Sequence, residues 1–180
     1  MLEIVIPEME CYDELNNEFI TVKETKLKLE HSLVSLKKWE EKWKVPFLHT
    51  QMNVEQQYDY IRCMTITQNV DPNVYKFIPS SVMTEINNYI NDPHTATKIY
   101  DNTPKKPGKK EIVTAEIIYY WMVSFNIPAE YQKWNLSQLM ALIEVCSIKN
   151  SPKKNMSRSS ILRQNNKLNA ARRKAYNSMG

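Results

Sequence analysis

The first thirty residues of the chain carry the pattern of short antiparallel strands. Apolar and polar side chains alternate loosely over residues 2–6 and strictly over residues 25–30, and residues 18–22 are β-branched and aromatic. Residues 13–17 supply the Asp and Asn side chains that favour a turn between the first two of these segments. The pattern predicts a small antiparallel sheet or a long hairpin at the amino terminus.

After residue 31 the apolar positions recur every three to four residues, which is the spacing of amphipathic helices. Capping side chains and prolines mark where such helices begin and end. The predicted helices cover residues 32–45, 53–67, 80–91, 135–150 and 157–176.

The spacing also predicts which side chains of these helices face inward. In the first helix, Leu33, Leu36, Trp39 and Trp43 face inward, whereas Lys37, Lys38, Glu40 and Glu41 face outward. The inward positions of the next two helices are Val54, Tyr58 and Ile61, and then Val82, Ile86 and Ile90. The helix after Asn135 has Leu136, Leu139, Met140 and Ile143 on its inward face.

Asn135 and Gln138 have the spacing of a capping box at the start of that helix. The last helix has only a thin apolar stripe of Ile161, Leu168 and Ala175. A stripe this thin indicates loose packing at most.

The segment Thr114 to Asn126 is the most apolar part of the chain, and it is apolar on every side. Such a segment is typical of a centrally buried helix, although its β-branched and aromatic residues leave a strand possible. Before it, Thr103 to Lys110 contains two prolines, a glycine and four lysines, which predicts a loop.

The predicted fold is α+β and mainly α, with the β element followed by about five helices and a basic C-terminal helix. Residues 1–150 are expected to form one globular domain, with the β element in residues 1–31 and the helices in 32–150. Residues 151–180 are expected to form a basic helical extension.

The charge of the chain is divided unequally along its length. The net charge is +4, but the nine basic residues after position 144 are accompanied by no acidic residue. The first 144 residues therefore carry 15 basic and 20 acidic residues, a net of −5. This division predicts that the basic segment docks on an acidic surface, on this protein or on a partner, or else binds nucleic acid.

Composition excludes several classes of enzyme. Glycine-loop nucleotide-binding motifs cannot be written with the two glycines, Gly108 and Gly180. The three cysteines and three histidines are too scattered for a disulfide framework or a zinc motif. No apolar stretch reaches the ~20 residues that a membrane span needs. We therefore expect a non-enzymatic protein of a reducing compartment, without cofactor, metal or membrane.

Aromatic and basic side chains are the candidates for contact with a partner. Tyr119, Tyr120 and Trp121 are adjacent, so they cannot all face one core, whereas Trp39 and Trp43 have the spacing of core residues. The full candidate set is Trp39, Trp43, Tyr119, Trp121, Trp134, Lys153, Lys154, Arg158, Arg163, Lys167, Arg172, Arg173 and Lys174.

Four runs of the sequence resemble the tail assembly chaperones of long-tailed bacteriophages. They are residues 27–49 (LKLEHSLVSLKKWEEKWKVPFLH), 60–76 (YIRCMTITQNVDPNVYK), 110–153 (KEIVTAEIIYYWMVSFNIPAEYQKWNLSQLMALIEVCSIKNSPK) and 156–175 (MSRSSILRQNNKLNAARRKA).

The resemblance implies a protein that binds the phage tape-measure protein and keeps its helical segments from aggregating. It also implies help in recruiting tail-tube subunits, action in the host cytoplasm, and absence from the mature virion. Many members occur in short and frameshift-extended forms, and this chain resembles the short form. Two alternatives stay open: a structural tail component of the virion, and a basic-tailed nucleic-acid-binding protein. Self-association is also possible.

Overall fold

The computed structural model describes residues 1–13, 17–98, 111–150 and 158–176. The predicted loop from Thr103 to Lys110 lies outside the described residues. The chain divides into two compact units, Met1–Ile148 and Lys149–Gly180. Within the described residues the architecture is α+β and mainly α, as the sequence predicts.

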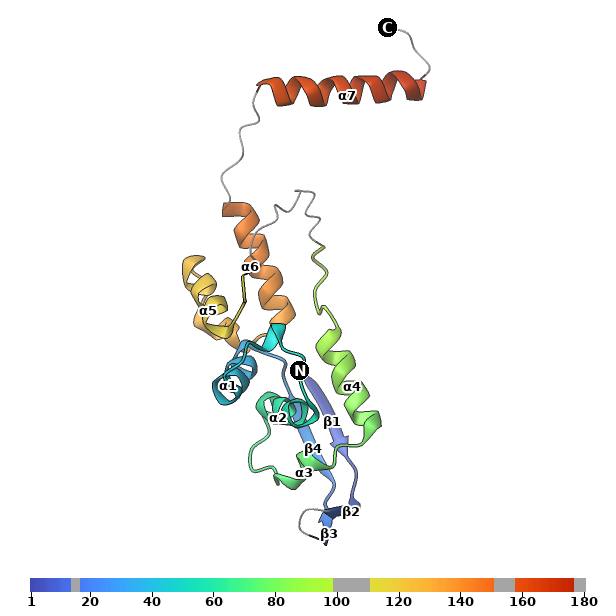
Figure 1. Ribbon diagram of the computed structural model, residues 1–180, viewed down its shortest axis with the longest axis vertical. Coiled ribbons are helices and arrows are strands. Elements are labelled where there is room, and N and C mark those ends of the chain that lie inside the picture. The colour runs from blue at the N-terminus through green and yellow to red at the C-terminus, as the bar shows by residue number, and fades with distance from the viewer. Residues whose placement is uncertain (14–16, 99–110, 151–157, 177–180) are drawn as a thin grey trace. The chain divides into compact units, whose positions relative to one another are not determined.

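The N-terminal β element is a long hairpin made of two antiparallel ladders (Figure 1). β1 (Leu2–Ile6) pairs with β4 (Thr25–Leu29), and β2 (Met9–Asp13) pairs with β3 (Glu18–Val22). Ile6 lies opposite Thr25 and Met9 lies opposite Val22, so the register continues unchanged from one ladder to the other. The interruption falls at Pro7, which has no N–H to donate.

The antiparallel prediction is confirmed, but the sequence does not predict β2. Residues 9–13 alternate too weakly to indicate a strand on their own. They form one because the register of β1 and β4, carried past Pro7, places them opposite β3.

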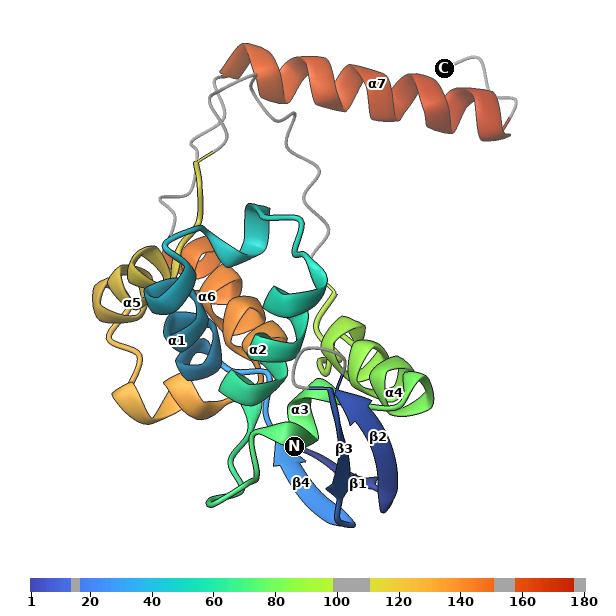
Figure 2. The same cartoon turned by 60° about the horizontal axis from the view of Figure 1, so that its bottom comes forward.

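Two hydrophobic clusters form the core of the first unit. The first joins the hairpin to α2 (Val54–Met64), α3 (Asn73–Lys76) and α4 (Ser80–Asn91). The second joins the N-terminal half of α1 (Leu33–Trp43) to α5 (Ala115–Ser124) and α6 (Leu136–Asn150). Figure 2 shows α1 between α5 and α2. α1 contributes Leu33 and Leu36 to the second cluster and Trp39 to the first, so it connects the two.

The ends of α1 follow from its sequence. The Ser32 and Ser35 side chains form a capping box with each other's backbone N–H groups, at 2.9 and 3.3 Å. Lys44 ends the helix in the left-handed conformation. These ends confirm the prediction. A short 3₁₀ helix, η1 (Phe47–His49), follows Pro46.

The predicted outward orientation of Glu40 is wrong, because this carboxylate is buried. Its Oε1 accepts a hydrogen bond from the backbone N–H of Phe47 at 2.7 Å. Its Oε2 accepts one from the N–H of Ala115, the first residue of α5, at 2.8 Å. One side chain of α1 therefore holds both η1 and the start of α5, where a negative charge is favourable.

α2 is shorter than the sequence predicts. Asn53 caps it as expected, but the helix ends at Met64 because the next residues bond to the edge of β4. The N–H of Ile66 donates to the carbonyl of Lys28 at 2.8 Å. Val54, predicted to face inward, is 65% exposed, whereas Ile61 is buried as predicted.

α4 has the predicted bounds and buries Val82 and Ile86. α6 buries Leu136, Leu139 and Ile143 of its predicted face. The predicted capping box at its start does not form. Asn135 Oδ1 accepts from the N–H of Ser137 at 3.0 Å, but Gln138 Nε2 donates to the carbonyl of His94 at 2.8 Å. This long-range bond replaces the local one.

The second unit contains α7 (Arg158–Tyr176), which confirms the predicted C-terminal helix. Its side chains are exposed wherever they are described, including Leu168 of the predicted apolar stripe.

Candidate functional site

α5 has one buried face, and its exposed side carries both apolar and polar residues. Ala115, Ile118 and Met122 pack into the second cluster. Tyr120 and Val123, on the other side of the helix, are 68% and 75% exposed. The predicted helix is confirmed, but the predicted central burial of this segment is wrong, because the second cluster covers only one side of it.

An apolar groove runs between α5 and α6. Its volume is about 350 Å³, and it is lined by Trp121, Phe125, Met140, Ile143, Glu144 and Ser147. We call this the α5–α6 groove. Four of its six residues are apolar, and the two polar ones both belong to α6.

The end of α5 holds Phe125 in place beside this groove. The N–H of Asn126 donates to the carbonyl of Val123 at 3.1 Å, and the N–H of Ile127 donates to that of Met122 at 2.8 Å. With Asn126 at a φ of 54°, these bonds form a Schellman motif. The motif closes the helix at Phe125 and turns the chain back toward α6.

α5 is also tied to neighbouring elements through Tyr119. The hydroxyl of Tyr119 donates to Gln132 Oε1 at 2.9 Å, which ties α5 to the 3₁₀ helix η2 (Ala129–Lys133). Lys37 of α1 lies over the Tyr119 ring, with its Nζ 5.7 Å from the ring centroid. Burial raises the pKa of Tyr119, so its hydroxyl stays protonated and donating at neutral pH.

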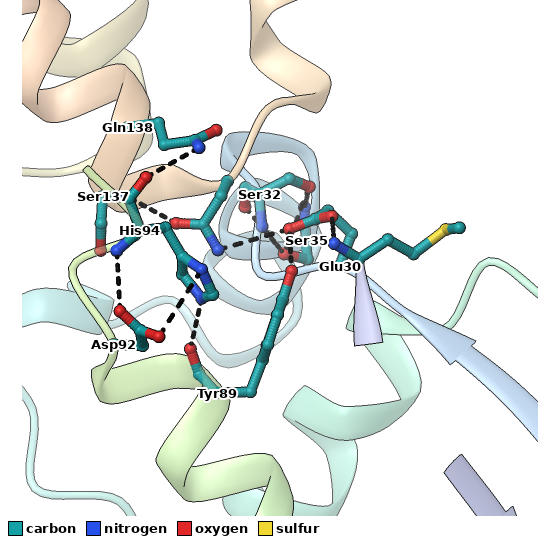
Figure 3. A network of polar contacts seen from close by, with 10 residues as sticks. Glu30, Ser32, Ser35, Tyr89, Asp92, His94, Ser137 and Gln138 are labelled. Atoms are coloured by element: carbon teal, nitrogen blue, oxygen red, sulfur yellow. Dashed lines mark hydrogen bonds and ion pairs between the residues drawn. The ribbon is translucent and has the colours of Figure 1, made fainter. Parts of the chain in front are cut away.

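A second, more polar cleft of about 790 Å³ lies between the end of β4, α4 and the start of α6. Figure 3 shows the side chains that meet there. Glu30 Oε1 accepts from the Tyr89 hydroxyl at 2.8 Å and from Asn135 Nδ2 at 3.4 Å. Glu30 Oε2 lies 2.9 Å from the amino group of Met1.

His94 extends this network on the α4 side (Figure 3). Its Nε2 lies 2.9 Å from the carbonyl of Tyr89, and its own carbonyl accepts from Gln138. Burial and the nearby Glu30 raise the pKa of Tyr89 to about 12. Tyr89 and Asn135 bond to the Glu30 side chain, whereas His94 and Gln138 bond to backbone carbonyls. The network joins three elements of the fold.

The buried titratable groups elsewhere are held in unreactive states. Burial lowers the pKa of His31 to about 4, and its Nδ1 lies 2.5 Å from the Tyr60 hydroxyl, whose pKa burial raises. Burial also raises the pKa of Cys63 to about 11, so it is a thiol rather than a nucleophilic thiolate at neutral pH. His31 is more deeply buried than the surface or partly buried position expected for the histidines.

Within the described ranges, no group of three or more His, Cys, Asp or Glu side chains is placed to hold a metal ion. Every buried side-chain nitrogen and oxygen described has a hydrogen-bond partner. None of the described helices is both long and apolar enough to cross a membrane.

The four tryptophans among the candidates lie in different surroundings. Trp39 is fully buried and donates to the carbonyl of Gln56 at 3.0 Å, so it serves the core and does not reach a partner. Trp43 is half-buried and donates to Asp59 Oδ2 at 2.9 Å. Trp121 lines the α5–α6 groove, whereas Trp134 stacks on Tyr131 and lines the polar cleft.

The basic candidates belong to the second unit. Lys153 and Lys154 lie outside the described residues, and Arg158 is the first residue of α7. The side chains of Arg163, Lys167, Arg172, Arg173 and Lys174 are exposed on α7.

The sequence did not single out Phe125 and Met140 as contact residues. The available signal was the apolar character of α5 on every side, because a helix packed along one face leaves its other apolar residues uncovered.

Comparison of the chain with protein-family models, curated proteins and solved structures finds no match.

Proposed function

We propose that this protein is a non-catalytic tail assembly chaperone of a long-tailed bacteriophage, with the tape-measure protein as its client. The observation that carries the proposal is the α5–α6 groove, whose apolar lining is Trp121, Phe125, Met140 and Ile143. An uncovered apolar surface of this kind is typical of a protein-binding site. The proposal also rests on the resemblance of four sequence runs to that family.

The groove fits an amphipathic helix of the client. Side chains spaced three to four residues apart along such a helix enter an apolar groove together. A groove of about 350 Å³ takes roughly one or two large side chains, and each contributes about 1.5–3 kcal/mol when fully buried. Binding of this strength is reversible, which suits a chaperone that releases its client during assembly.

The polar groups support binding rather than chemistry. In the larger cleft the Tyr89 hydroxyl donates to Glu30, His94 bonds to the backbone carbonyl of Tyr89, and Tyr89 is held as the neutral phenol. A catalytic constellation needs a nucleophile or a base directed at a substrate.

Co-expression with a fragment of the tape-measure protein tests this function. We expect the fragment to stay soluble with the wild-type chain and to precipitate with Ser147→Glu, because Ser147 is an exposed residue that lines the groove and a charge there opposes burial of client side chains. Val54→Glu is the matched control, since Val54 is also exposed but lies on α2 and does not line the groove. The proposal fails if the fragment precipitates with the wild-type chain, or if both variants behave alike.

The composition of purified phage particles separates this function from a structural one. A chaperone that recruits tail-tube subunits and then leaves is absent from mature particles. A stoichiometric amount of this chain in the tail would instead indicate a structural component.

A further inference from the structure

α7 carries its positive charges in an arrangement that selects one kind of partner. The helix contains no acidic residue, and its described side chains are exposed. Leu168 and Ala175 are seven residues apart, Ile161 precedes Leu168 by the same interval, and Ala171 lies between Leu168 and Ala175. Residues at this spacing occupy the a and d positions of a coiled-coil heptad, and in this register the d position of the first heptad is the polar Gln164.

The charged residues take defined places in the same heptad. With Leu168 and Ala175 at a and Ala171 at d, Lys167 and Lys174 occupy g positions and Arg172 an e position. Side chains at e and g flank the apolar seam and face the partner helix. Arg163 and Arg173 fall at c and f, on the side that faces away from a partner.

These positions disfavour pairing of α7 with a second copy of itself. In a parallel two-stranded coiled coil, a residue at g faces the residue five positions later on the other helix. Lys167 would then face Arg172 of the second copy, and like charges at these positions repel. A helix with glutamates at e and g replaces this repulsion with attraction at Lys167, Arg172 and Lys174.

We infer that α7 is one strand of a heterotypic coiled coil, whose partner is an acidic amphipathic helix with apolar residues at a and d and glutamates at e and g. The small Ala171 and Ala175 let the two backbones approach closely. The inference is independent of the α5–α6 groove, because it concerns a different helix and a different chemistry.

A titration of the full chain tests this with a labelled synthetic peptide of about three heptads, carrying Ile and Leu at a and d and Glu at e and g. We expect fluorescence anisotropy to show saturable binding that weakens with added salt. The double variant Lys167→Glu, Lys174→Glu should bind about tenfold more weakly. The control Arg163→Glu, Arg173→Glu changes the charge equally but should bind almost as well as the wild type.

A charge-swapped peptide with Lys at e and g excludes unfolding as the explanation. It should bind the variant with glutamates at 167 and 174 and fail to bind the wild-type chain. Equal loss of binding in both double variants would overturn the inference, and so would tighter binding to a random-sequence DNA duplex than to the acidic peptide. Either result would show that α7 responds to negative charge in general and not to a heptad partner.

Discussion

Glu40 shows how one buried side chain holds two distant segments of the chain together. Its two carboxylate oxygens accept from Phe47 and Ala115, which lie in different segments of the chain. Both partners are backbone N–H groups at the start of a helix, where the helix itself offers them no acceptor. A carboxylate satisfies both because each of its two oxygens accepts one hydrogen bond.

Glu40→Gln should lower the free energy of unfolding by about 1–3 kcal/mol, because an amide offers one acceptor oxygen and turns its NH₂ toward a donor. Glu41→Gln is the matched control, since Glu41 is the exposed neighbour on the same helix. Urea denaturation followed by circular dichroism measures both. Equal stability of the two variants would show that the Glu40 bonds add nothing.

His31 is expected to make stability depend on pH. Burial lowers its pKa to about 4, whereas its ordinary value is 6.5. Between these values the unfolded chain binds a proton that the folded protein does not, so the free energy of unfolding falls as the pH drops from 6.5 to about 4. The loss amounts to at most about 3 kcal/mol.

His31→Gln should remove this part of the pH dependence, whatever it does to stability at neutral pH. Urea denaturation of both proteins across the acidic range gives the two slopes. An unchanged slope in the variant would assign the pH dependence to other groups.

Among the elements, the sequence predicts correctly those helices whose ends are set by residues close by in the chain. Ser32 and Asn53 each cap the helix that follows them, and both caps are visible in the sequence. The errors fall where distant residues intervene. Glu40 bonds to a residue 75 positions away, and Gln138 bonds to one 44 positions away.

The candidate site was only partly predictable for the same reason. The sequence singled out Trp121, but the groove also needs Phe125 and Met140, which belong to different helices. Which side of an all-apolar helix stays uncovered depends on how many helices pack against it. The sequence pattern contains no signal for that number.

Asn126 should be sensitive to substitution because its left-handed backbone ends α5. Asn126→Gly should keep or slightly raise stability, because glycine adopts positive φ without steric cost. Asn126→Val should cost about 1–2 kcal/mol, since a β-branched residue is strained there. Thermal unfolding measures the midpoints of the two variants. Similar midpoints would show that the left-handed conformation at this position does not affect stability.

At the scale of the whole first unit, α1 is the only element among those described that contributes buried residues to both hydrophobic clusters. Leu36 and Trp39 are both fully buried, and they lie within one turn of each other in different clusters. Packing changes in one cluster therefore act directly on the helix that supports the other. This arrangement predicts that the two clusters unfold together.

Leu27→Ala in the first cluster and Leu139→Ala in the second should each lower the free energy of unfolding by about 2–5 kcal/mol, because both side chains are fully buried. In each variant, the near-ultraviolet and far-ultraviolet circular dichroism signals should change in one coincident transition. Val54→Ala, at an exposed site, is the control and should leave the midpoint nearly unchanged. Two separated transitions in either core variant would mean that α1 does not couple the clusters. The groove on the second cluster would then be able to open while the hairpin stays folded.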